Sequence, residues 1–153
     1  MVSTKLRKFI FGVVVSVSFV LAIGCVGKAP APPPVQFSDT NYQGIINVEP
    51  REAYYLIQNN RDNPNFVIID VRLTKLLAYG YIEGAVNVPL NTSNLAAFES
   101  QIASLDRDKT YLTYCPDGCG AAANIMNSLG FNKIYDIKGG YQSWLEEGLP
   151  IIE

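Results

Sequence analysis

The 153-residue sequence contains no histidine, and charged residues make up only 17% of it. Without imidazole, the chain excludes Ser-His and Cys-His catalytic pairs and every metal site that uses histidine ligands. A formal net charge of -2 provides no basic field for a polyanion, so we expect no nucleic-acid partner. Cysteine is also scarce, with three residues, which leaves few thiols for chemistry.

Apolar residues are abundant, at 48% of the chain, which is enough to build a buried core. That composition excludes a wholly disordered or collagen-like chain. The length fits one domain of roughly 100–200 residues and excludes two full-sized ones. We therefore expect a single globular core and see no internal repeat.

The N-terminal segment has the three parts of an export signal in their usual order. Lys5, Arg7 and Lys8 form a basic start, and a nearly apolar run from Phe9 to Ile23 follows. The run is shorter than the roughly 20 apolar residues that a membrane-spanning helix needs. It therefore favours a cleaved signal, with an uncleaved anchor as the alternative.

The end of this run, Leu21-Ala22-Ile23-Gly24-Cys25, resembles the bacterial lipobox, which implies cleavage before Cys25 and lipidation of that residue. The alternative for Cys25 is an ordinary buried thiol. We expect residues 1–24 to be a signal peptide, 25–40 a lipidated, proline-rich tether, and 41–153 the folded domain. The resemblance implies an exported protein, lipid-anchored to a bacterial membrane, whose domain faces the periplasm or the cell exterior. Without residues 1–24 the chain keeps 9 basic and 14 acidic residues, a net charge of -5, so anchoring would depend on acyl chains.

Short β-rich runs alternate with helix-length segments after the tether. The expected strands are Gly44 to Val48, Phe66 to Val71, Ala85 to Val88, Tyr111 to Tyr114 and Lys133 to Ile137. Four helices are expected. The first begins at Pro50, the third at Ala121, and the fourth after Gly139-Gly140; the second has its cap within Asn91 to Ser93 and runs to about Leu105. This alternation predicts an α/β fold, with a parallel central sheet of about five strands and helices on both faces. In such a fold, functional residues lie at the C-terminal ends of the strands.

A cysteine-containing loop follows the strand Tyr111 to Tyr114 and leads into a helix. Backbone amides at a helix N-terminus stabilise anions, so a thiol at Cys115 would have a lowered pKa and could act as a nucleophile without histidine. Gly118 and Gly120 allow the backbone conformations that a tight anion-binding loop requires. Alternatively, Cys115 is a small apolar residue that closes a strand. The loop alone leaves both interpretations open.

Residues 45–150 resemble the rhodanese (sulfurtransferase) family in four stretches that occur in the family's order. The matching stretches are Phe66-Val67-Ile68-Ile69-Asp70-Val71-Arg72, then Gly80 to Leu90, then Tyr114-Cys115-Pro116-Asp117-Gly118, and lastly Gly130-Phe131 through Gly139-Gly140 and Trp144 to Gly148-Leu149-Pro150. The resemblance implies a single rhodanese-like domain in which Cys115 accepts sulfane sulfur as a persulfide and passes it on. It implies a small donor such as thiosulfate or polysulfide, a thiol or other nucleophile as acceptor, and no metal or cofactor.

The same resemblance assigns roles around Cys115. The loop that binds the anionic substrate would comprise Pro116, Asp117, Gly118, Cys119, Gly120 and Ala121. Asp70 and Arg72 would form an ion pair at a strand end that supports this loop, or else a solvated charge pair. Trp144 and the aromatic residues near it would be core residues.

Two departures from the family bear on activity. The family's loop is C-x-x-G-x-R-S, but Gly120 stands at the arginine position and Ala121 at the serine position. Without a guanidinium to hold small oxyanions, we expect weak thiosulfate turnover, and the phosphatases of this fold are disfavoured. Tyr81 replaces a family histidine, which we interpret as neutral for the sulfur chemistry.

Cys119 lies four residues after Cys115 and leaves two interpretations open. It could attack a persulfide on Cys115 as a resolving thiol, release sulfide and leave a disulfide between the two cysteines, or it could fill a variable position of the loop. Two alternatives to a sulfurtransferase follow: a catalytically weak binding module of the same fold, and a thiol redox protein that uses Cys115 and Cys119. The sequence leaves the oligomeric state open.

Overall fold

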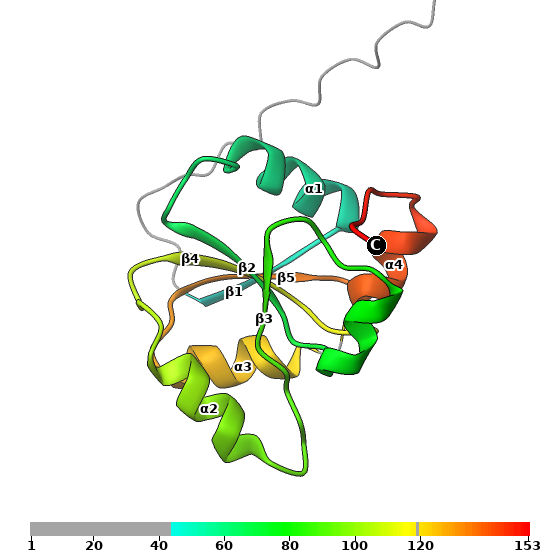
Figure 1. Ribbon diagram of the computed structural model, residues 1–153. Helices are drawn as coiled ribbons and strands as arrows, with labels where there is room; N and C mark the ends of the chain where they lie inside the picture. The colour runs from blue at the N-terminus through cyan, green and yellow to red at the C-terminus, as the bar shows by residue number, and fades with distance from the viewer. Residues whose placement is uncertain (1–43, 119) are drawn as a thin grey trace, which may run out of the picture. The chain divides into compact units, whose positions relative to one another are not determined.

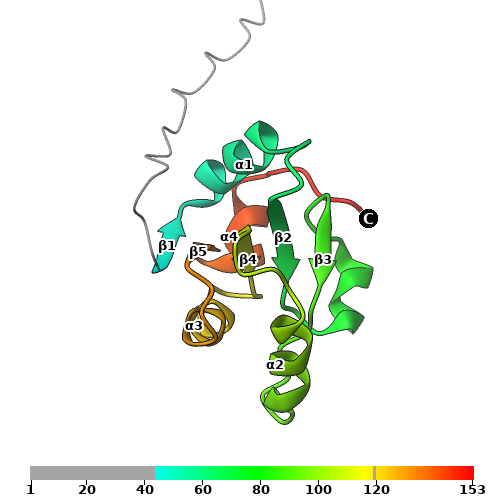
Figure 2. The ribbon, with the colours of Figure 1, turned by 90° about the vertical axis from the view of Figure 1, so that its left-hand side faces the viewer.

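Five parallel strands form one sheet in the computed structural model, which describes residues 44–118 and 120–153. The strands are β1 (Gly44–Val48), β2 (Phe66–Asp70), β3 (Ala85–Asn87), β4 (Thr110–Tyr114) and β5 (Lys133–Ile137). Their order across the sheet is β1-β5-β4-β2-β3, as Figure 2 shows from left to right. The predicted parallel sheet of five strands is confirmed, and β4 lies at its centre.

Helices cover both faces of the sheet, as predicted. The helices α1 (Pro50–Asn59) and α4 (Gly140–Glu146) lie on one face, and α2 (Leu95–Ala103) and α3 (Ala121–Ser128) lie on the other (Figure 1). Side chains of a strand point alternately to the two faces, so Tyr111 of β4 packs with α2 and α3 while Leu112 packs with α1 and α4. The apolar strands are therefore buried from both sides.

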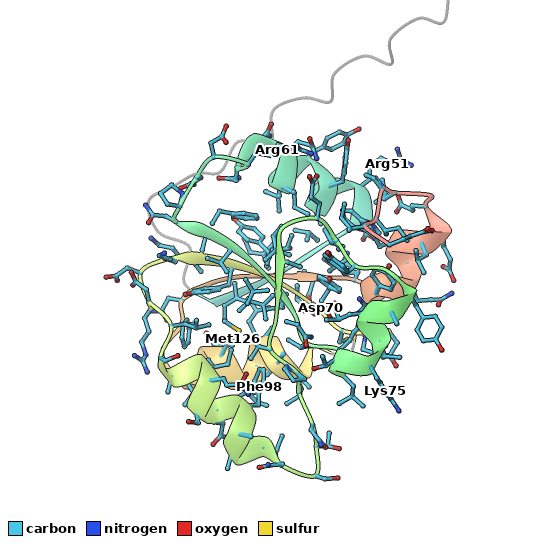
Figure 3. All side chains as sticks on the ribbon, in the orientation of Figure 1. Arg51, Arg61, Asp70, Lys75, Phe98 and Met126 are labelled. Carbon is cyan, nitrogen blue, oxygen red and sulfur yellow. The ribbon has the colours of Figure 1, made fainter. Side chains whose placement is uncertain are left out.

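Each face has its own apolar cluster. Phe98 of α2 and Met126 of α3 are fully buried between their helices and the sheet (Figure 3). On the other face, Leu56 of α1 and Trp144 of α4 are 1% exposed. Full burial of a large apolar side chain contributes about 1.5–3 kcal/mol, so these clusters hold the helices against the sheet. The prediction that Trp144 is a core residue is confirmed.

The ends of the helices follow local capping chemistry. Pro50 occupies the first turn of α1, where its missing N–H costs no hydrogen bond, and the Glu52 carboxylate accepts the Glu49 N–H at 3.0 Å. The predicted cap of α2 is wrong: Asn94 caps it by accepting the Ala97 N–H at 3.3 Å, whereas Asn91 accepts a bond in the preceding turn. This helix also ends at Ala103, before Leu105.

One further element was not expected from the sequence, the six-residue 3₁₀ helix η1 (Thr74–Tyr79), which has no buried residue. The predicted signal peptide 1–24, the tether 25–40 and the lipidation site Cys25 lie outside the described residues, as does Cys119. Within residues 44–118 and 120–153, no helix is long and apolar enough to cross a membrane.

Candidate active site

Cys115 follows directly after the central strand β4, at the C-terminal edge of the sheet. The chain leaves β4 towards β5 on one side and leaves β2 towards β3 on the other, so the connections diverge at this point. Such a switch point is where parallel α/β sheets bind ligands. Asp70 and Tyr114 are register partners, and the Val71 N–H donates to the Tyr114 carbonyl at 3.0 Å. The segments that follow β2 and β4 therefore leave the sheet side by side.

The Cys115 sulfur lies between two contacts of opposite electrostatic effect. Its Sγ accepts the backbone N–H of Gly118 at 2.9 Å and lies 3.6 Å from Oδ1 of Asp117. An N–H donor stabilises a thiolate, whereas a neighbouring carboxylate disfavours it. Cys115 is only 5% exposed and packs with the core on the α2 and α3 face, while Pro116 and Asp117 are exposed.

The backbone of this loop is held by the first turn of α4. The Tyr141 N–H donates to the Cys115 carbonyl at 2.8 Å, and the Gln142 N–H donates to the Pro116 carbonyl at 3.0 Å. A Cβ at Gly140 would overlap the Cys115 carbonyl oxygen and come within 2.7 Å of the Gly118 nitrogen. Glycine at position 140 therefore allows the backbone of α4 to contact the backbone of the cysteine loop. This contact fixes the peptide groups around the sulfur.

The predicted loop residues take up the conformations that their types allow. Gly118 and Gly120 have φ values of +75° and +64°, in the left-handed region that favours glycine. Gly120 precedes the first residue of α3, Ala121, and its carbonyl accepts the Asn124 N–H at 3.0 Å. Because Cys119 lies outside the described residues, its role as a resolving thiol stays a prediction.

Asp70 and Arg72 form a buried ion pair. Nε and Nη2 of Arg72 donate to the Asp70 carboxylate at 3.0 and 2.7 Å. Arg72 is 3% exposed and Asp70 is 0% exposed. The carbonyl of Gly80 accepts a further Arg72 N–H at 2.8 Å, and the Tyr114 hydroxyl donates to Asp70 Oδ2 at 2.8 Å. A buried charge needs such partners. The alternative of a solvated charge pair is therefore wrong.

This ion pair reaches the cysteine loop through two tyrosines. The Arg72 guanidinium carbon lies 3.7 Å from the centre of the Tyr141 ring and 5.5 Å from that of Tyr114. Burial works against the charge of Arg72, but the contacts with Asp70 and the tyrosines outweigh it and raise the pKa of Arg72 above its usual value. Tyr114 precedes Cys115, and the Tyr141 amide binds the Cys115 carbonyl. The pair thus positions the loop from the α1 and α4 face.

These tyrosines, together with a buried acid, are the site residues that sequence reasoning missed. Asp136 of β5 is 3% exposed and accepts the Thr113 hydroxyl at 2.7 Å, and burial raises the pKa of Asp136 although the Thr113 hydrogen bond opposes the rise. Its Oδ2 lies 3.6 Å from where a Cβ at Gly120 would stand. A lone acidic residue in the apolar run Lys133–Ile137 is the signal that could have revealed it. The loop therefore borders a carboxylate at the position where the family has an arginine.

Comparison with known proteins defines the class. The chain belongs to the Rhodanese-like domain family, whose model matches residues 52–147. A rhodanese-related protein from Thermoplasma volcanium has a similar structure, with a TM-score of 0.55 and 31% sequence identity, covering 72% of this chain and 98% of that one. The family and the fold predicted from the four sequence stretches are confirmed.

Two curated relatives show how far the similarity extends. A protein named sulfurtransferase from Allochromatium vinosum is 25% identical over 100 residues, which cover 63% of this chain and 88% of that protein. A tRNA uridine(34) hydroxylase from Picosynechococcus is 31% identical over 111 residues, which cover 69% of this chain. The matched region spans only 35% of that hydroxylase.

Proposed function

We propose that this protein is a sulfurtransferase that carries sulfane sulfur as a persulfide on Cys115. The observation that carries the proposal is the 2.9 Å hydrogen bond from the Gly118 N–H to Cys115 Sγ, at the switch point of a rhodanese-like sheet. A donor at this distance stabilises negative charge on sulfur, which both a nucleophilic thiolate and a persulfide anion require. The similarity to a protein named sulfurtransferase supports the same activity.

The proposed reaction needs no external oxidant or reductant. The Cys115 thiolate attacks the outer sulfur of a polysulfide, or the sulfane sulfur of thiosulfate, and a new S–S bond forms while the donor's bond breaks. The leaving group, a shorter polysulfide or sulfite, keeps the electron pair of the broken bond. An acceptor thiolate then attacks the outer sulfur of the persulfide and releases the Cys115 thiolate, ready for another cycle.

The geometry restricts what can donate sulfur. With 5% of Cys115 exposed, a donor must present a slender terminal sulfur to reach Sγ. Gly120 and Ala121 supply no side chain that could hold an oxyanion, so thiosulfate would bind weakly. We therefore propose polysulfides or persulfides as better donors than thiosulfate, and a low-molecular-weight or protein thiol as the acceptor.

Mass spectrometry of the full-length chain tests the proposal. The reduced chain is incubated with polysulfide and the Cys115 peptide is weighed, with Cys115→Ser as the control. We expect a gain of about 32 Da, one sulfur atom, on the Cys115 peptide of the parent chain, and release of that sulfur to an added thiol. An unmodified Cys115 after treatment with both polysulfide and thiosulfate would refute the activity.

We further propose that the protein is exported and lipid-anchored through Cys25, with the domain held by the 25–40 tether at the periplasmic or outer side of a bacterial membrane. The support is the order of basic, apolar and lipobox residues in the first 25 positions. Labelling cells with radioactive palmitate tests it, because only a lipidated chain retains the label. Cys25→Ser should lose the label and leave the membrane fraction; a labelled Cys25→Ser chain would contradict the anchor.

A binding module of the same fold is the second candidate, favoured by the 5% exposure of Cys115 and the missing loop arginine. It predicts that Cys115→Ser restores function in a deletion strain as well as the parent gene does. Failure of that variant to restore function would reject the binding module.

A redox role for Cys115 and Cys119 requires a reversible disulfide between them in oxidised buffer. Two reduced thiols in that buffer would reject the redox role.

A further inference from the structure

The side chains around Cys115 give the site an acidic character. Residues 115–121 contain no lysine or arginine, and the one charged side chain in that stretch, Asp117, lies 3.6 Å from the nucleophilic sulfur. Below the loop, the buried carboxylate of Asp136 lies near Gly120, where the family has an arginine. The Thr113 hydroxyl already holds Asp136, whereas Asp117 is exposed and can contact an arriving molecule.

We propose that Asp117 selects the sulfur donor by charge, and that the preferred donor is a small persulfide bearing an ammonium group, in preference to thiosulfate. This inference rests on the proposed sulfur transfer at Cys115 and names its substrate class. An aminoalkyl persulfide has the slender terminal sulfur that the buried thiol requires, with a positive charge a few bonds away. Thiosulfate carries two negative charges on a group only one bond from the transferred sulfur.

The thiol hydrogen bond indicates when Asp117 becomes available. In the structure the Cys115 thiol donates to Asp117 Oδ1, so the carboxylate has a hydrogen-bond donor while the sulfur is protonated. When the thiol ionises, that donor is lost and the carboxylate faces a like charge. An ammonium group on the donor molecule replaces the lost hydrogen bond and neutralises the carboxylate in the same step. A sulfite leaving group would instead add negative charge beside it.

The expected size of the effect follows from Coulomb's law. Two unit charges about 6 Å apart in water change a rate roughly threefold, and Asp117 is exposed enough for this high-dielectric estimate to hold. Reagents that differ by two units of charge should therefore differ roughly tenfold in their response to Asp117. Added salt should reduce that difference, because the Debye length falls to about 3 Å at 1 M.

Charged methanethiosulfonates measure this effect separately from thiol ionisation. Aminoethyl and sulfonatoethyl methanethiosulfonate both react with the thiolate, which forms a mixed disulfide and expels methanesulfinate. The fraction of ionised Cys115 cancels in the ratio of the two rates. The rates are measured on the reduced full-length chain for the parent, Asp117→Asn and Asp62→Asn. Fragmentation of the peptide that contains both Cys115 and Cys119 assigns the label to Cys115. Asp62 is an exposed acid in the turn before β2, at the opposite edge of the sheet, and serves as the matched control.

We expect Asp117→Asn to lower the ratio of cationic to anionic rates roughly tenfold at low salt, and Asp62→Asn to leave it unchanged. The parent chain should also take sulfur from cysteamine persulfide faster than from thiosulfate, and Asp117→Asn should narrow that gap. A ratio that Asp117→Asn does not change, or a parent chain that prefers thiosulfate, would overturn the inference. If the ratio falls as expected but neither donor leaves sulfur on Cys115, the charge selection stands and the proposed sulfur transfer fails.

Discussion

The guanidinium of Arg72 lies over the ring of Tyr141, with 3.7 Å between the arginine Cζ and the ring centre, and the Tyr141 amide donates to the Cys115 carbonyl. A buried ion pair on one face of the sheet is thus connected to the candidate nucleophile through a single residue. Cys115 itself packs on the other face. We therefore propose a positional role for the pair, which would act on the backbone around the sulfur.

Removing Arg72 should destabilise the domain strongly. Arg72→Met leaves the Asp70 carboxylate buried without its partner, and breaking such a pair costs about 3–5 kcal/mol of unfolding free energy. Arg61→Met is the matched control, because the Arg61 to Glu83 pair is exposed at both ends and contributes about 0–1 kcal/mol. Urea unfolding of both variants measures the difference. Equal losses in the two variants would contradict the structural role given to the buried pair.

Gly140→Ala should both destabilise the domain and disturb the cysteine loop. At φ +56° an added Cβ is strained, and it would overlap the Cys115 carbonyl as well. Gly148→Ala is the control, since Gly148 has φ +64° but nothing within 4 Å of the added atom. Both variants should lose about 1–2 kcal/mol to backbone strain, and Gly140→Ala roughly 1–3 kcal/mol more to the overlap.

The second effect of Gly140→Ala appears in the chemistry of the thiol. We expect its Cys115 to react with iodoacetamide at a changed rate, because the peptide groups around the sulfur must move, while Gly148→Ala keeps the parent rate. Thermal unfolding and peptide-resolved alkylation measure the two effects. Parent-like alkylation in a folded Gly140→Ala chain would show that the loop does not depend on this contact.

Because of Asp136, the free energy of unfolding of the domain should decrease as the pH rises from acid to neutral. Burial raises the pKa of Asp136, so the folded chain holds that proton more tightly than the unfolded chain does. Stability is therefore lost between the ordinary carboxyl pKa of about 3.9 and the raised folded value. Asp136→Asn removes this loss and keeps an oxygen for the Thr113 hydroxyl. Its unfolding free energy relative to the parent should increase from pH 4 to pH 7, whereas exposed Asp62→Asn should show no such trend; a flat Asp136→Asn difference would contradict the prediction.

The sequence predicted the sheet because its strands are continuous apolar runs of the kind that a parallel sheet buries on both faces. Phe66–Asp70 shows this most clearly, with four consecutive apolar residues before Asp70. The cap of α2 was misplaced because Asn91, Ser93 and Asn94 are all competent cap residues, and only the path of the chain decides among them. The 3₁₀ helix η1 is only six residues long and buries none of them, so it shows no helical repeat of buried apolar positions.

The site was predictable where residues are neighbours in sequence, and not where the fold brings them together. The loop from Cys115 to Ala121 is continuous, and its glycines indicate its backbone conformation. The contact of Arg72 with Tyr141 joins segments that are far apart in the chain, so no local pattern reveals it. The burial of Asp136 likewise depends on its register with Thr113 across two strands.

The ionisation of Cys115 tests the central claim most directly, namely that backbone amides stabilise the Cys115 thiolate without a basic side chain. The rate of alkylation of Cys115 by uncharged iodoacetamide across pH, assigned to Cys115 and not Cys119 by fragmentation of the peptide that contains both, reports the thiolate fraction. We predict a half-point in the parent chain below the value of about 8.5 for an ordinary cysteine, and a lower one still in Asp117→Asn. A half-point at or above about 8.5 in both chains would contradict the account.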